Sequence, residues 1–184
     1  LDLNLQKTIC VVIFFCSILT TSLRAEKPQF QEHLIRDGYG YAYGVAAADL
    51  DGDGDLDLTS SDTDRDKLLW FENDGAGKFT ERLIQKDDPG WFERHAVGDV
   101  DGDEHLDVVV VKNKDGDVLW FRNNGTPQDG KLWQRHVVTK GDLPGAYDVA
   151  LADFDGDGDL DVAASSWTRG KRFVWFANPG EDKL

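Results

Sequence analysis

The feature that most constrains the fold is an aspartate-rich nonapeptide that occurs three times. Its copies, DLDGDGDLD, DVDGDEHLD and DFDGDGDLD, occupy residues 49–57, 99–107 and 153–161. A second marker follows each copy: the sequences LWFEN, LWFRN and VWFAN end at Asn73, Asn123 and Asn178. Self-similarity at a spacing of about 20–50 residues is typical of solenoids, propellers and other repeat arrays. The chain is therefore predicted to be a tandem repeat.

Each copy is predicted to be built from β-strands. Short runs of β-branched and aromatic residues alternate with clusters of Gly, Asp and Asn, which is typical of strands joined by tight turns. No stretch after residue 25 keeps a helical hydrophobic period. The predicted strands cover residues 45–50, 56–60, 67–72 and 79–85, then 96–100, 106–111, 118–122 and 133–139, then 149–154, 160–165 and 172–177.

This pattern predicts an all-β fold of β-propeller blades, with three four-stranded repeats over residues 45–86, 95–140 and 148–180, because blades are four-stranded units of about 40–50 residues. The Trp-Phe pairs of the second marker are expected to pack between blades. The third copy stops before a fourth strand, and residues 29–36 resemble an isolated fourth strand that completes another blade. Propellers have about four to eight blades. We therefore expect either part of a larger closed propeller or, if the chain is complete, a homo-oligomer.

The nonapeptides have the spacing of calcium loops. Carboxylates stand at alternate positions and again at the ninth, directly before a strand. Calcium takes six to eight oxygen ligands from carboxylates, carbonyls and water, and the residue at position seven of such loops supplies its carbonyl. We predict about three Ca²⁺ ions, one in each loop. The predicted metal-site residues are Asp49, Asp51, Asp53, Asp55, Asp57, Asp99, Asp101, Asp103, His105, Asp107, Asp153, Asp155, Asp157, Asp159 and Asp161.

Loop two departs from the pattern, and two other interpretations of the loops exist. Glu104 and His105 replace the Gly and Asp of the other loops, so the second site is expected to be the weakest. EF-hand and dockerin loops begin alike, but they need flanking helices and a carboxylate at position twelve. That position is Ser60, Val110 or Ala164, and the segments that follow the loops are strand-like. A merely solvated acidic turn has no need to repeat the same four carboxylates.

These loops resemble those of the FG-GAP/VCBS repeat family, the integrin-α-type calcium-binding propellers, over roughly residues 29–180. The resemblance implies that each loop joins the first two strands of a blade and binds calcium through its carboxylates. The family includes adhesion modules, sugar-binding domains and domains attached to polysaccharide-active enzymes. The resemblance therefore leaves open which of these functions the chain has.

The loops at the opposite end of the predicted strands are rich in aromatic and charged residues, which suit carbohydrate stacking or anchoring of a protein partner. A carbohydrate or protein ligand is expected on that face, although packing at blade edges is the other interpretation. The residues are Tyr39, Tyr41, Tyr43, Trp91, Phe92, Arg94, His95, Tyr147, Asp148, Asp62, Asp64, Arg65, Lys112, Lys114, Trp167, Arg169 and Arg172.

An enzymatic function is the alternative to adhesion or ligand binding. A calcium-dependent lyase or dehydratase acting on sugars would have His95, Arg94 and Tyr43 as its candidate residues. The sequence contains no G-x-S-x-G or H-E-x-x-H motif, and the acid–base constellation expected of an active site is missing. No catalytic residue is therefore assigned.

Residues 1–25 are predicted to be a cleaved signal peptide. Residues 8–20 form an uncharged apolar run that is shorter than the roughly 20 residues needed to span a bilayer and fits a signal h-region. The mature chain, residues 26–184, is expected to be secreted, without stable membrane insertion. Both cysteines, Cys10 and Cys16, would leave with the signal, so disulfides cannot stabilise what remains.

The charge of the chain favours cations as partners. The formal net charge is −15, and each of the three loops carries five of the 35 acidic residues. Such a chain is expected to repel nucleic acid and anionic membrane surfaces and to attract divalent cations.

Overall fold

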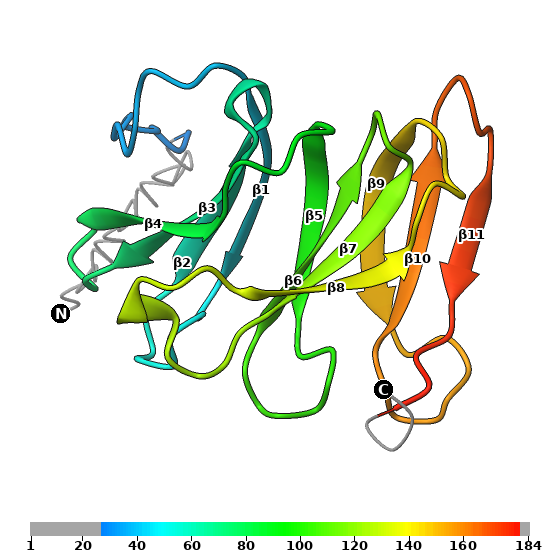
Figure 1. Cartoon of the computed structure of the whole chain (residues 1–184). Helices are drawn as coiled ribbons and strands as arrows, with labels where there is room; N and C mark the ends of the chain where they lie inside the picture. The colour runs from blue at the N-terminus through cyan, green and yellow to red at the C-terminus, as the bar shows by residue number, and fades with distance from the viewer. Residues whose placement is uncertain (1–26, 181–184) are drawn as a thin grey trace, which may run out of the picture. The chain divides into compact units, whose positions relative to one another are not determined.

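The computed structural model describes residues 27–180, and this part of the chain is all-β (Figure 1). The chain divides into two units, Leu1–His33 and Leu34–Leu184, and every strand belongs to the second. The strands are β1 (Ala42–Ala48), β2 (Asp57–Asp62), β3 (Lys67–Asn73), β4 (Phe79–Gln85), β5 (Phe92–Gly98), β6 (Asp107–Lys112), β7 (Asp117–Arg122), β8 (Gln134–Thr139), β9 (Ala146–Ala152), β10 (Asp161–Ser166) and β11 (Phe173–Phe176). Two short 3-10 helices, η1 (Thr63–Arg65) and η2 (Pro127–Asp129), complete the elements of residues 27–180.

The strands form three antiparallel sheets in which neighbours in sequence are neighbours in space. The orders are β1-β2-β3-β4, β5-β6-β7-β8 and β11-β10-β9. The pairs Ala48 with Asp57, Gly98 with Asp107 and Ala152 with Asp161 close the three aspartate-rich loops at equivalent registers. The sequence repeat is thus a structural repeat, although the third sheet has three strands and not the four of a full repeat.

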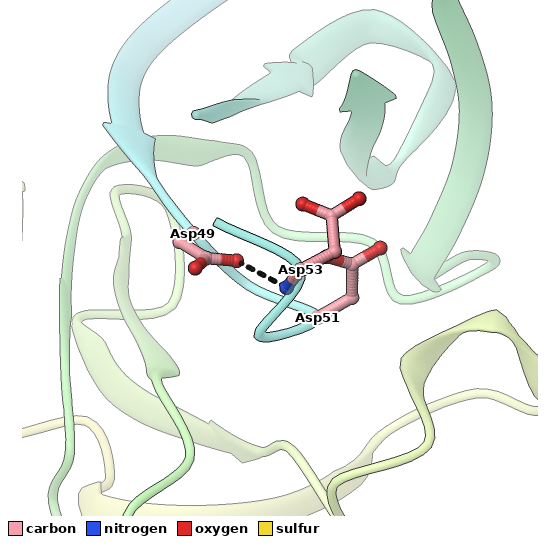
Figure 2. A group of neighbouring side chains, drawn as sticks. All are labelled: Asp49, Asp51 and Asp53. Carbon is pink, nitrogen blue, oxygen red and sulfur yellow. Dashed lines mark hydrogen bonds between the residues drawn. The ribbon is translucent and has the colours of Figure 1, made fainter. Parts of the chain in front are cut away.

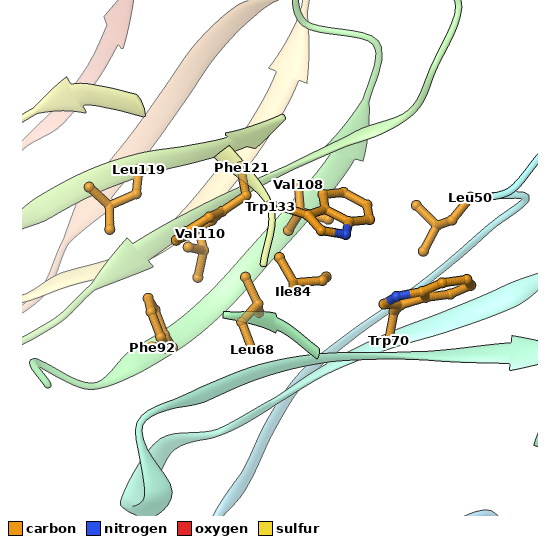
Figure 3. Packing of buried hydrophobic residues seen from close by; sticks show 10 residues of the cluster. All are labelled: Leu50, Leu68, Trp70, Ile84, Phe92, Val108, Val110, Leu119, Phe121 and Trp133. Carbon is orange, nitrogen blue, oxygen red and sulfur yellow. The ribbon is translucent and has the colours of Figure 1, made fainter. Parts of the chain in front are cut away.

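The sheets pack face to face through apolar side chains, and β5 contacts both of the other first strands, β1 and β9. In the first interface, Trp70 and Ile84 of the first sheet meet Phe92 and Phe121 of the second (Figure 3). In the second interface, Trp120 packs in one cluster with side chains of the third sheet. Trp70, Phe121 and Trp120 belong to these two clusters, which confirms the predicted packing between sheets for them, whereas Phe71 is buried outside both clusters.

The third sheet leaves one apolar face open. Phe154, Phe173 and Trp175 are 48%, 83% and 48% exposed. Together with Ala163 and Val174 they line a hollow of about 600 Å³. Trp175 holds the marker position of Trp70 and Trp120, so a side chain that is buried in two sheets is half exposed in the third.

The first strand of each sheet begins and ends earlier than predicted. The strands β1, β5 and β9 end at residues 48, 98 and 152, before the positions predicted from their apolar residues. Leu50, Val100 and Phe154 lie within the loops, where their backbone N–H groups donate to the ninth-position aspartates and not to a neighbouring strand. An apolar residue that follows a strand therefore extended the prediction beyond the true end of that strand.

Residues 29–36, predicted as an isolated strand, form no strand. Residues 27–39 have no regular secondary structure, and their backbone pairs with no other strand in the described part of the chain. Phe30 and Leu34 are largely exposed. The predicted signal peptide lies outside the described residues and stays a prediction. Within residues 27–180, no helix is long and apolar enough to cross a membrane.

Candidate metal sites

Each aspartate-rich loop joins the first two strands of one sheet. All three loops lie at the same end of the strands, at the bottom of Figure 1. In each loop three carboxylate oxygens lie within 4.8 Å of one another, so each group could hold a metal ion. The groups are Asp49, Asp51 and Asp53 (Figure 2), then Asp99, Asp101 and Asp107, then Asp153, Asp155 and Asp161. Strands flank every loop, as predicted against the EF-hand alternative.

The first aspartate of each loop organises the backbone around itself. Asp49 Oδ1 accepts hydrogen bonds from the amides of Gly52 and Asp53 at 2.8 and 3.1 Å, and Oδ2 accepts one from Gly54 at 3.0 Å (Figure 2 draws the second). Asp99 accepts the equivalent three bonds in loop two, and Asp153 accepts two of them in loop three. These bonds curl the loop, so that carboxylates alternate along a short closed turn.

Loop two keeps this backbone despite its altered sixth residue. Gly54 and Gly158 have φ values of 96° and 100°, and Glu104 has a φ of 70°. A left-handed conformation costs a residue other than glycine about 1–2 kcal/mol. The carboxylate spacing of loop two is therefore preserved at some cost in backbone energy.

The ninth aspartate of each loop is fully buried and clamps the loop to the third strand of its sheet. Asp107 accepts hydrogen bonds from the amides of Val100 and Asn123 at 3.2 and 2.7 Å, and Asp57 and Asp161 accept the equivalent pairs. Burial raises the pKa of Asp107 to about 7, although these hydrogen bonds act in the opposite direction. A bound cation would favour the charged form of this carboxylate.

The third-position aspartates repel their neighbours. Burial is the largest cause that raises the pKa values of Asp51, Asp101 and Asp155. The nearby carboxylates of Asp53, Asp103 and Asp157, respectively, also raise them. In loop one, Gln128 of η2 also donates from Nε2 to Asp51 Oδ2 at 2.7 Å. Gln128 was not foreseen because it reaches the loop from the neighbouring sheet.

In the second and third sheets, the asparagine that ends the Trp-Phe marker links its loop to the preceding sheet. Asn123 Nδ2 donates to the carbonyls of Leu50 and Leu106 at 2.8 and 3.2 Å. Asn178 Nδ2 donates to those of Val100 and Leu160 at 2.8 and 3.1 Å. Asparagine closes all three markers, but Asn73 Nδ2 donates only to the carbonyl of Leu56 in its own loop.

The position-seven side chains lie outside the three carboxylate groups. Those of Asp55, His105 and Asp159 lie against the glycines two residues beyond the marker asparagines and leave no room there for a Cβ. Any contribution of these three residues to metal binding therefore comes from their backbone.

At the opposite end of the sheets, four residues predicted on the partner face come together, although they belong to the first strands and not to loops. Arg94 Nη1 lies 3.0 Å from Asp148 Oδ2, and its guanidinium carbon lies 5.9 and 4.5 Å from the ring centroids of Tyr43 and Tyr147. Tyr43, Arg94 and Asp148 border a hollow of about 600 Å³, and the Tyr147 ring lies beside it, 6.5 Å from that of Tyr43. The Trp167 ring lies 5.8 Å from that of Tyr147.

Other residues predicted on that face have separate structural contacts. Lys112 is buried and pairs with Asp88 and Asp115 at 2.7 and 2.8 Å. Trp91 stacks under the ammonium of Lys114 at 3.7 Å. Asp62 accepts hydrogen bonds from backbone amides of residues 40 and 41. These residues stabilise loops and are not part of the Tyr43–Arg94 hollow.

The three candidate catalytic residues do not form an acid–base pair. His95 Nε2 is 2.7 Å from Thr59 Oγ1 between two sheets, and burial lowers its pKa to about 4. Arg94 is paired with Asp148. Burial raises the pKa of Tyr43, so its hydroxyl keeps its proton at pH 7.

The fold and the loops together define a class: an all-β repeat protein whose hairpins carry acidic, metal-competent loops. A model of the FG-GAP-like repeat matches residues 49–110 and again residues 99–164, and each match runs from one loop into the second strand of the next sheet. The chain belongs to the FG-GAP-like repeat family. No curated protein matches the sequence.

Proposed function

We propose that this protein is a calcium-binding repeat module of β-propeller type, exported from the cell, in which ions in the acidic loops stabilise the hairpins. The observation that carries the proposal is the recurrence of three carboxylate oxygens within 4.8 Å of one another in equivalent hairpins. Two unit charges 4 Å apart repel by about 4 kcal/mol at an effective dielectric constant of 20. A divalent cation converts this repulsion into attraction. Export rests on the predicted signal peptide.

Calcium fits these loops better than other common metals. The clustered donors are all carboxylate oxygens, which suit hard cations, and calcium accepts an irregular shell of six to eight oxygens. Zinc prefers nitrogen and sulfur ligands, and the only histidine of the loops, His105, has its side chain outside the carboxylate groups. Magnesium demands near-ideal octahedral geometry and keeps most of its water.

Calcium is expected to raise the melting temperature, and chelator to lower it, with dissociation constants in the extracellular-module range of roughly 10⁻⁴–10⁻³ M or tighter. Calorimetric titration with calcium and with magnesium measures the affinities. Asp53→Ala should weaken binding, because Asp53 belongs to a carboxylate group, whereas the matched control Asp55→Ala should not. A melting temperature that neither calcium nor chelator changes would contradict the proposal.

The Tyr43–Arg94 hollow supports a second function, the binding of carbohydrate. Aromatic faces suit stacking on sugar rings, and an arginine–aspartate pair offers both donors and acceptors to hydroxyl groups. Its volume of about 600 Å³ lies in the range of ligand pockets. Trp167, 64% exposed, extends the aromatic surface beside Tyr147.

A glycan array should identify a bound carbohydrate, and Tyr43→Ala should then weaken its binding by about tenfold, or about 1.4 kcal/mol, because Tyr43 lines the hollow. Trp91→Ala is the matched control, because Trp91 is also partly exposed but stacks on Lys114 instead. Retention of full affinity by Tyr43→Ala would place the site elsewhere.

A further inference from the structure

Loop two contains a positive charge among its carboxylates. Arg122, the last residue of β7, places Nε 2.5 Å from Asp101 Oδ2 and Nη2 2.9 Å from Asp103 Oδ2. Asp101 is almost buried, and Asp101 and Asp103 stand at the third and fifth positions of the loop. The guanidinium thus bridges two carboxylates that were both predicted to coordinate an ion.

The other loops have no such group. The residues equivalent to Arg122, which lie between the phenylalanine and asparagine of the markers, are Glu72 and Ala177. Glu72 is bonded to Arg82 at 2.7 Å, and Ala177 carries no charge. Within residues 27–180, no lysine, arginine or histidine pairs with an aspartate of loop one or loop three.

A guanidinium suits this position well. Its planar fork presents several fixed N–H donors, and hydrogen bonds between charged partners are stronger than neutral ones. Unlike a bound ion, it cannot be removed by chelator, and it keeps its proton at every physiological pH. A calcium ion entering loop two would have to displace this side chain or share the carboxylates with it.

We propose that Arg122 takes the place of a calcium ion in loop two, so that the chain binds ions in loops one and three only. The inference rests on the proposed calcium function. It replaces the expectation of three ions with a chain in which the middle loop is closed by an internal ion pair. Loop two, which carries this ion pair, is also the loop in which Glu104 and His105 depart from the pattern of the other two loops.

Equilibrium dialysis with radioactive calcium, or native mass spectrometry, counts the ions bound by the full chain. We expect two ions for the wild type and a third for Arg122→Ala, because removing the guanidinium frees loop two. Arg135→Ala is the matched control: Arg135 lies on the adjacent strand β8 and pairs with Asp88 and Asp117, away from the loop. It should leave the count at two.

A second set of variants tests occupancy without altering Arg122. Asp51→Ala and Asp155→Ala should each lower the count by one, whereas Asp101→Ala, at the same loop position, should leave it unchanged. A wild type that binds three ions, a count lowered by Asp101→Ala, or an Arg122→Ala protein that folds yet gains no ion would each overturn the inference. A wild type that binds no calcium at all would instead overturn the proposed function.

Discussion

His95 lies between the first and second sheets as a neutral, buried side chain. Its pKa is lowered to about 4 by burial, whereas a histidine in an unfolded chain titrates near 6.5. Between about pH 6.5 and pH 4 the unfolded chain therefore binds a proton that the folded chain does not. The contribution of His95 to stability is complete above pH 6.5 and is lost as the pH falls through this window.

Replacement of His95 should remove this pH dependence. The wild type should lose up to about 3 kcal/mol of unfolding free energy between pH 6.5 and pH 4 through this residue, whereas His95→Gln should not. Denaturant unfolding at several pH values, with chelator present throughout, isolates the difference. The exposed His33 supplies the control variant His33→Gln, which should follow the wild type. Parallel pH profiles for wild type and His95→Gln would contradict the account.

Single residues of the loops were predictable to different degrees. The spacing of the aspartates revealed the loops, because ligands that come from one short segment leave their pattern in the sequence. Arg122 and Gln128 left no such pattern: one reaches loop two from the third strand of its sheet, and the other reaches loop one from η2 of the next sheet. Their roles depend on contacts between segments distant in sequence.

At the scale of elements, the order and approximate positions of all eleven strands of the described residues followed from the alternation of β-formers with turn residues. The bounds of the first strands did not, since Leu50, Val100 and Phe154 look like strand residues but donate to an aspartate. Residues 29–36 have the composition of a strand but pair with no strand within residues 27–180. Strand formation needs both.

The corrected bounds of the first strands also change how three residues of the predicted partner face are held. Tyr43, Arg94 and Tyr147 were assigned to loops, where they would move independently of the sheets. They lie in β1, β5 and β9, whose mutual contacts hold them at fixed separations. A ligand site built on strands is more rigid than one built on loops.

At the scale of the whole repeat, the third sheet presents side chains that the other sheets bury. Phe154, Phe173 and Trp175 correspond to Leu50, Leu68 and Trp70, which are 3%, 0% and 0% exposed. Contiguous apolar surface of this kind promotes association between molecules. The net charge of −15 opposes association, because like-charged molecules repel one another in solution.

Calcium should act on this balance in two opposite senses. Each bound ion stabilises the fold but also cancels two negative charges, so the better-folded protein should be the more prone to self-associate through its third sheet. Light scattering at rising protein concentration should show calcium-dependent association of the wild type that Phe173→Ser with Trp175→Ser abolishes. Phe30→Ser, which removes an even more exposed phenylalanine from a different segment, should leave it intact. If the double variant associates as the wild type does, the surface responsible for association lies elsewhere. If the double variant stays monomeric, the ion that protects this protein from heat also reduces its solubility.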